Sequence, residues 1–231
     1  MREEVHIWRA VANAEVAIEE LVQHLSPDER LRSERFRLAE DRRRFVVARS
    51  MLRQVIGAYL DMAPSEVGFE YGAYGKPMLG QLLRASGLRF SVSHSQSIAL
   101  LAVVQGREVG IDVEFVCDRC PALKSINRYL THAEARELRS LDPQSQTLGF
   151  YQCWTRKEAY LKARGCGLQK PLSSFQVSLA PGKPARFVAG VDSDWKLASF
   201  HPAQDYVAAV AASSGGVRLK MQEWKPDLQF N

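Results

Sequence analysis

The spacing of apolar and polar residues predicts both strands and helices in each half of the chain. Short apolar or alternating runs at Leu88–Ser93, Ile98–Val104 and Val109–Phe115 predict three successive strands. Apolar residues recur at helical spacing through Glu40–Leu60 and through Phe150–Gly165, which ends on a glycine typical of helix C-termini. This mixture of elements predicts an α+β fold.

Capping and turn residues delimit the remaining elements. The pattern predicts a strand at Val5–Trp8 and a helix at Asn13–His24. Ser26 followed by a proline is typical of a helix start, and Thr131 with Glu134 three residues later forms a capping-box pattern. Four further short strands are predicted at Phe175–Leu179, Arg186–Val188, Lys196–Phe200 and Tyr206–Ala211.

The two halves follow the same order of elements. A helix at Phe45–Leu60 precedes a Pro-Ser pair and a strand at Val67–Tyr71, and a helix at Phe150–Arg164 precedes Pro171–Ser174 and the strand at Phe175–Leu179. One such half could not cover its own sheet. We therefore expect two similar, pseudo-duplicated lobes, residues 1–105 and 106–231. Each is a small antiparallel sheet packed with helices, and a ligand cleft lies between them.

Length and composition are those of a globular protein. The chain has 231 residues, of which 46% are hydrophobic. It contains no apolar run long enough to span a bilayer, and its first residues lack a signal-peptide pattern, so we expect a cytoplasmic protein with no membrane partner. Cys117 and Cys120 have zinc-ligand spacing, but no second such pair accompanies them, which favours free thiols.

Arginine is concentrated in one stretch, although the formal net charge is a moderate +5. Acidic residues interleave with these arginines, so a solvated helix face is one interpretation. The other is a site for a polyanion, either nucleic acid or a phosphate-rich small molecule. Because no nucleic-acid-binding signature is present, we expect the small molecule and no nucleic acid. The arginines are Arg30, Arg32, Arg35, Arg37, Arg42, Arg43, Arg44, Arg49 and Arg53.

Three carboxylates are candidates for a cation site. Asp112 and Glu114 alternate within a predicted strand and therefore share one face, which suits a hard cation such as Mg²⁺; the other interpretation is a solvated edge strand. Glu158 and Lys157 interrupt the apolar stripe of the Phe150–Gly165 helix, where charges need partners or a metal. A surface ion pair between Glu158 and Lys162, one turn apart, is the simpler alternative.

Four motifs in order resemble those of the 4′-phosphopantetheinyl transferases, and most resemble the larger Sfp-like class. The sequence G-I-D-V-E-F at Gly110–Phe115 is followed, some forty residues on, by W-T-R-K-E-A-Y-L-K at Trp154–Lys162. Tyr74–Pro77 resembles the family's G-K-P turn, and Phe90–Ser95 resembles its F-x-x-S-H-S segment. The ordered set is specific, whereas each motif alone is weak.

The resemblance implies transfer of the 4′-phosphopantetheine arm of coenzyme A to a serine of an apo acyl or peptidyl carrier protein, with release of 3′,5′-ADP. It implies that Asp112, Glu114 and Glu158 hold Mg²⁺, with Mn²⁺ as an alternative. Glu158 and Lys162 would be catalytic. Glu158 would be metal ligand, base for the serine proton, or both, and Lys162 would neutralise the leaving phosphate.

The resemblance also implies a coenzyme A site and a monomeric chain, because Sfp-like enzymes look like fused copies of a smaller fold that trimerises. The coenzyme-binding residues it suggests are Arg32, Arg44, Lys76, Ser93, His94, Lys157 and Lys162. Glu29 departs from the family's paired basic residues. The alternative function is a non-catalytic module that binds coenzyme A or a carrier protein, which predicts loss of a carboxylate or of Lys162; none is lost.

Overall fold

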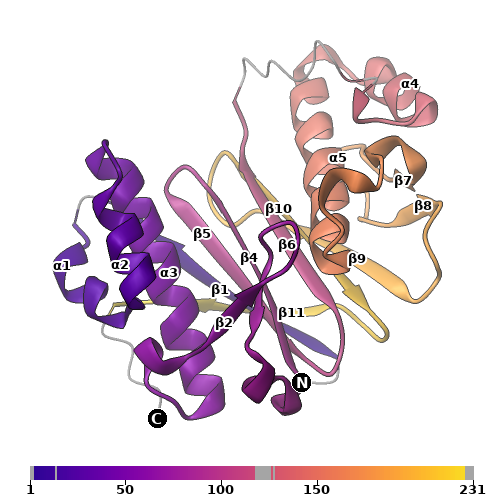
Figure 1. Cartoon of the computed structure of the whole chain (residues 1–231). Helices are drawn as coiled ribbons and strands as arrows, with labels where there is room; N and C mark the ends of the chain where they lie inside the picture. The colour runs from indigo at the N-terminus through magenta and orange to yellow at the C-terminus, as the bar shows by residue number, and fades with distance from the viewer. Residues whose placement is uncertain (1–2, 14, 118–125, 127, 227–231) are drawn as a thin grey trace.

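Two main sheets lie between two long helices in the computed structural model, which describes residues 3–13, 15–117, 126 and 128–226 (Figure 1). The first sheet has the strand order β11-β1-β5-β4, and the second has the order β6-β10-β9. The strands are β1 (Glu4–Val11), β4 (Leu88–Ser95), β5 (Ile98–Gln105), β11 (Arg218–Glu223), β6 (Val109–Phe115), β10 (Tyr206–Ser213) and β9 (Trp195–Phe200).

Helices and two small hairpins follow the same order in both halves. The first half has α1 (Ile18–Leu21), α2 (Pro27–Glu34), α3 (Ala39–Leu60) and the hairpin β2 (Phe69–Tyr71)–β3 (Pro77–Leu79). The second half has α4 (His132–Ser140), α5 (Pro143–Arg164) and the hairpin β7 (Gln176–Val177)–β8 (Phe187–Ala189). Within the described residues, 3₁₀ turns lie at Val22–His24, Pro64–Glu66, Gln81–Ser86, Gly167–Gln169 and Leu172–Ser174. The α+β prediction is confirmed. In the described part of the chain, no helix is both long and apolar enough to cross a membrane.

The structure has four layers in the order helix, sheet, sheet, helix, and its core consists of the hydrophobic clusters that lie between adjacent layers. One cluster fills the space between α3 and the first sheet, and another lies between α5 and the second sheet. A third joins the inner faces of the two sheets. β5 is continuously apolar because Leu101 and Val103 face α3 while Leu100 and Ala102 face the second sheet.

Capping residues explain where the long elements begin and end. Ser26 and Thr131 begin α2 and α4 with capping boxes, as predicted. The residue that follows α3 is Asp61, with φ of 53°, and the residue that follows α5 is Gly165, with φ of 63°. Both are left-handed conformations that stop a helix, and glycine adopts them at the lower cost.

Three details differ from the pattern-based predictions. The helix expected at Asn13–His24 is only the short α1 and a 3₁₀ turn, because this segment buries little beyond Ile18 and Leu21. α5 begins at Pro143, seven residues before the expected Phe150. β11 was not predicted; it is largely exposed, so it carries little apolar signal, yet it pairs in parallel with β1.

Candidate functional site

The predicted catalytic helix lies directly against the strand that carries the two carboxylates. A Cβ atom at Gly110 of β6 would lie 2.0 Å from the Ala159 carbonyl oxygen and 2.3 Å from the Ala163 amide nitrogen of α5. Only glycine permits this approach. It brings Glu158 and Lys162, one turn apart on α5, to the side of β6 that bears Asp112 and Glu114.

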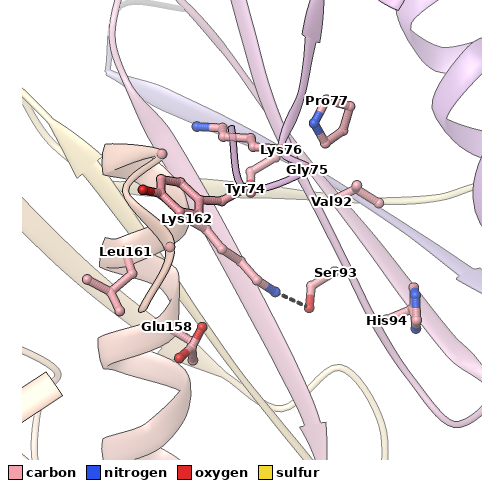
Figure 2. A pocket seen from close by; sticks show the side chains of 13 residues that line it. Tyr74, Gly75, Lys76, Pro77, Val92, Ser93, His94, Glu158, Leu161 and Lys162 are labelled. Carbon is pink, nitrogen blue, oxygen red and sulfur yellow. Dashed lines mark hydrogen bonds between the residues drawn. The ribbon is translucent and has the colours of Figure 1, made fainter. Parts of the chain in front are cut away.

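Asp112, Lys162 and Ser93 form the centre of the site. The Lys162 ammonium donates to Ser93 Oγ at 2.7 Å (Figure 2). It also donates to Asp112 Oδ1 at 2.6 Å, and Ser93 Oγ donates to the same Oδ1 at 3.0 Å. Asp112 is 4% exposed, and its Oδ2 has no hydrogen-bond partner among the described residues. A buried carboxylate oxygen without a donor is costly for stability alone.

Glu158 is the second carboxylate with an oxygen left over. Its Oε1 is buried and has no hydrogen-bond partner in the described structure. Burial, followed by the charge of Asp112, raises the pKa of Glu158 to about 7; Lys162 opposes this and Glu114 adds to it. In Figure 2 its carboxylate lies below Lys162 and across from Ser93. A proton can therefore be gained or lost at Glu158 near neutral pH.

Glu114 is held by side chains of β4 and α5. The Ser95 hydroxyl of β4 donates to Glu114 Oε2 at 3.0 Å. Burial and the charge of Asp112 raise the pKa of Glu114, and hydrogen bonds from Ser95 and from the Trp154 side chain of α5 limit the rise. Ser95 and Trp154 were not among the predicted site residues, although both belong to the quoted motifs.

Two neighbouring pockets, which share lining residues and together form a groove, extend from this centre toward α2 and α3. A pocket of about 360 Å³ is lined by Tyr74, Lys76, Ser93, His94, Glu158 and Lys162 (Figure 2). A neighbouring pocket of about 430 Å³ shares His94 and is lined by Arg32, Phe36, Arg44, Phe45, Arg49 and Tyr71. Desolvation and the charges of Lys162 and Arg44 lower the pKa of His94. The structure thus brings nearly all of the predicted coenzyme-binding residues to one groove.

Lys76 connects the β2–β3 turn to the second lobe. Its ammonium donates to the carbonyl oxygens of Val109 at 3.3 Å and Ala163 at 3.2 Å. Burial lowers the pKa of Lys76, and the charge of Glu108 partly compensates. Two of its three donors are engaged, and the side chain lines the pocket.

Lys157 is the predicted residue that the structure keeps away from this group. Its side chain is 1% exposed, and its ammonium pairs with Glu134 at 2.6 Å. It also donates to the carbonyl oxygens of Leu172 at 2.6 Å and Phe175 at 2.9 Å. These three bonds use all the donors of an ammonium, so none remains for a phosphate in this conformation. Adjacent helix positions point in different directions, which separates Lys157 from Glu158.

The buried environment of Glu29 accounts for the acidic residue at this position. Glu29 is 3% exposed, accepts a hydrogen bond from the Ser26 amide, and forms ion pairs with Arg49 and Arg53. Burial alone would raise the pKa of Glu29, but the bonds from Arg53 and Arg49 hold it below its usual value. The Arg-rich stretch therefore divides between this structural role and the groove, where Arg32 and Arg44 lie.

The described residues contain no cluster of three or more His, Cys, Asp or Glu side chains arranged as a ready metal site. Cys117 is an exposed free thiol, and Cys120 lies outside the described residues. The oxygens left without partners on Asp112 and Glu158 are nevertheless of the hard type that Mg²⁺ takes.

Two family profiles match the chain on either side of residue 107. The profile described as "4'-phosphopantetheinyl transferase superfamily" matches residues 108–211. The profile described as "4'-phosphopantetheinyl transferase, N-terminal" matches residues 8–106. The 4′-phosphopantetheinyl transferase HetI of a Nostoc species is 38% identical over 227 residues, which cover 98% of this chain and 92% of that protein.

The chain belongs to the 4′-phosphopantetheinyl transferase superfamily. The transferase Sfp of Bacillus subtilis is 32% identical over 70% of this chain and 69% of that protein, which supports the Sfp-like class. The holo-(acyl-carrier-protein) synthase of Bacillus anthracis, solved in complex with CoA (3′,5′-ADP), covers 47% of this chain and 96% of its own, with 20% identity and a TM-score of 0.40. The protein is a 4′-phosphopantetheinyl transferase.

Proposed function

We propose that Asp112, Glu114 and Glu158 hold a magnesium ion against the pyrophosphate of coenzyme A, and that Lys162 and Glu158 carry out the transfer. The observation that carries this proposal is the pair of buried carboxylate oxygens without hydrogen-bond partners among the described residues, Asp112 Oδ2 and Glu158 Oε1, on two residues whose charges interact with each other and with Lys162. Mg²⁺ or Mn²⁺, when bound, would neutralise charge on the pyrophosphate.

Lys162 and Ser93 serve the leaving group. The serine oxygen of the carrier protein forms a bond to the phosphorus that bears pantetheine, and the bond from that phosphorus to the bridging oxygen breaks, which releases 3′,5′-ADP. Lys162 can leave Asp112 for the departing phosphate without losing an ionic partner. The Ser93 hydroxyl keeps a hydrogen bond within the same triad.

Glu158 is suited to accept the proton of the carrier serine. A base is most effective when its pKa lies near the working pH, and in the metal-free protein the pKa of Glu158 is raised to about 7. A bound divalent cation would favour the ionised carboxylate, which is the form that accepts a proton. The nearby charges of Asp112 and Lys162 act on the Glu158 carboxylate, so its protonation differs from that of a carboxylate on an open surface. The serine proton would move to Glu158 directly or through one water molecule.

The nucleotide end of coenzyme A binds across the two neighbouring pockets in this proposal. Arg32 and Arg44 supply planar guanidinium groups for the 3′-phosphate, and Lys76 supplies its remaining donor. His94 lies between the two pockets and contacts the phosphates. The aromatic rings of Phe36 and Phe45 give the pocket of Arg32 and Arg44 an apolar surface suited to a base.

One assay tests the assignment. The protein is incubated with coenzyme A, Mg²⁺ and an apo acyl carrier protein, and the carrier is weighed by mass spectrometry. We expect a gain of one phosphopantetheine unit, lost when EDTA is added and restored by excess Mg²⁺ or Mn²⁺. Activity that survives thorough removal of divalent cations would refute the metal role. We also propose that the protein is a cytoplasmic monomer. Sedimentation of the purified protein measures its mass and so tests the oligomeric state.

A further inference from the structure

Strand β4 contacts β6 through a row of three serine side chains and not through a backbone ladder. β4 and β6 belong to different sheets, yet Ser91, Ser93 and Ser95 alternate along β4 and all face β6. Ser91 Oγ accepts from the Ile111 amide at 3.2 Å, and Ser95 Oγ accepts from the Phe115 amide at 3.1 Å. The serine row therefore sets the register between the two lobes.

Ser95 makes a second bond that ties this register to a site carboxylate. A hydroxyl has one donor and two acceptor sites. The oxygen of Ser95 is held by the Phe115 amide, and its proton is donated to Glu114 Oε2 at 3.0 Å. Because Glu114 and Phe115 are neighbours in β6, one side chain fixes both the strand and the carboxylate that projects from it.

Ser91 provides an internal comparison. It makes the matching contact with the β6 backbone, but the residues opposite it are Gly110 and Ile111, which bear no carboxylate. Loss of either hydroxyl removes one link between the lobes. Loss of Ser95 alone also frees Glu114.

We propose that Ser95 is a positioning residue, which holds the Glu114 carboxylate in the orientation that the divalent cation requires. This rests on the proposed role of Glu114 as a metal ligand. Hydrogen bonds that orient ligands commonly change metal affinity by about 10- to 100-fold. The first lobe would thus contribute to a metal site whose ligands all belong to the second.

The test measures Mn²⁺ binding to the protein–coenzyme A complex without carrier protein, from the electron paramagnetic resonance signal of free Mn²⁺. Ser95→Ala should weaken Mn²⁺ binding about tenfold. Ser95→Thr, which keeps the hydroxyl, should bind Mn²⁺ nearly as the unaltered protein does. Ser91→Ala should do the same when coenzyme A is saturating, a condition that is needed because Ser91 lines the coenzyme pocket. In steady-state assays, Ser95→Ala should raise the Mg²⁺ concentration for half-maximal rate and leave kcat at saturating Mg²⁺ within about twofold.

Glu114→Gln distinguishes the positioning role of Ser95 from the role of Glu114 as a metal ligand. If Glu114→Gln weakens Mn²⁺ binding but Ser95→Ala does not, or if Ser91→Ala weakens it as much as Ser95→Ala, the positioning role of Ser95 is wrong and the ligand set stands. If Glu114→Gln leaves Mn²⁺ binding unchanged, the metal role of Glu114 is wrong, and the role of Ser95 is wrong with it.

Discussion

The Arg53 guanidinium of α3 and the Lys157 ammonium of α5 make matching contacts in the two halves of the chain. Arg53 pairs with the capping-box residue Glu29 and donates to carbonyl oxygens in the turn after its helix. Lys157 pairs with the capping-box residue Glu134 and donates to carbonyls in the corresponding turn. Each cation fastens a short helix to a long one and to the chain that follows.

This match predicts that Lys157 serves stability and Lys162 serves chemistry. Lys157→Met would leave Glu134 as a buried, unpaired charge and should cost about 3–5 kcal/mol in the free energy of unfolding. Lys162→Met should remove activity. It also deprives the buried Asp112 carboxylate of its cation, so it should lower stability as well, but by less than Lys157→Met, because the Lys162 side chain is 31% exposed and water reaches that ion pair. Urea unfolding and the carrier-modification assay check both variants; a stable, inactive Lys157→Met protein would return Lys157 to the phosphate site.

Asp112→Asn should keep the fold and abolish turnover. The amide preserves the shape and accepts the Ser93 hydroxyl, but it removes the charge that pairs with Lys162 and suits a cation. We expect turnover to fall by about 100-fold or more, as for other groups that stabilise charge in a transition state. Near-normal turnover at saturating Mg²⁺ would contradict the assignment.

Glu158→Gln should stabilise the protein, and more so at high pH. The pKa of Glu158 lies at about 7 in the folded protein against an ordinary value of 4.5, so the folded state binds the proton more tightly and stability falls as pH rises between these values. The variant removes that cost. Without divalent cations, its gain should be small near pH 4.5 and reach at most about 3 kcal/mol above pH 7, with solvent access reducing this bound. Urea midpoints across this range measure the trend, and turnover should collapse at every pH. A gain independent of pH would count against the raised pKa.

Lys76→Ala should discriminate between two coenzymes. If the remaining donor of Lys76 contacts the 3′-phosphate, the variant should raise KM for coenzyme A more than for 3′-dephospho-coenzyme A. The carbonyls of Val109 and Ala163 also lose a donor, so KM for both is expected to rise somewhat. Arg44→Ala removes another proposed contact with the 3′-phosphate and should likewise raise KM more for coenzyme A than for 3′-dephospho-coenzyme A. Equal losses for the two coenzymes would leave Lys76 with a bracing role alone.

Gly110→Ala should prevent normal packing of the catalytic helix. The new methyl group would lie within 2.3 Å of two α5 backbone atoms, which no side-chain rotation relieves. We expect loss of folded protein on expression, or stability reduced by about 3 kcal/mol or more. Gly68→Ala, where no atom lies within 4 Å of the new carbon, is the matched control. Circular dichroism melts of the two variants make the comparison.

The sequence predicted the elements and motifs better than the direction of individual side chains. The predicted bounds of Val109–Phe115 match the structure, and those of Ala39–Leu60 agree within one residue, whereas α5 begins seven residues before its predicted start. Lys157 and Glu158 are adjacent in one apolar stripe, and periodicity cannot tell which faces the core and which the groove. Their roles depend on Glu134 and Asp112, which are distant in sequence.

The partnership of β1 with β11 bears on the order in which the protein acquires its structure during synthesis. Arg9 and Glu223 are separated by 214 positions, and their side chains pair where the two strands run side by side. Trp224, just beyond β11, donates to Gln54 of α3. A ribosome adds about 5–20 residues per second, so α3 and the β1 edge would wait roughly ten seconds or more for these contacts. The second lobe can be complete before the first is closed. The outer edge of β1 is therefore unpaired until β11 has been synthesised, and an unpaired strand edge of this kind is prone to aggregation unless a chaperone covers it.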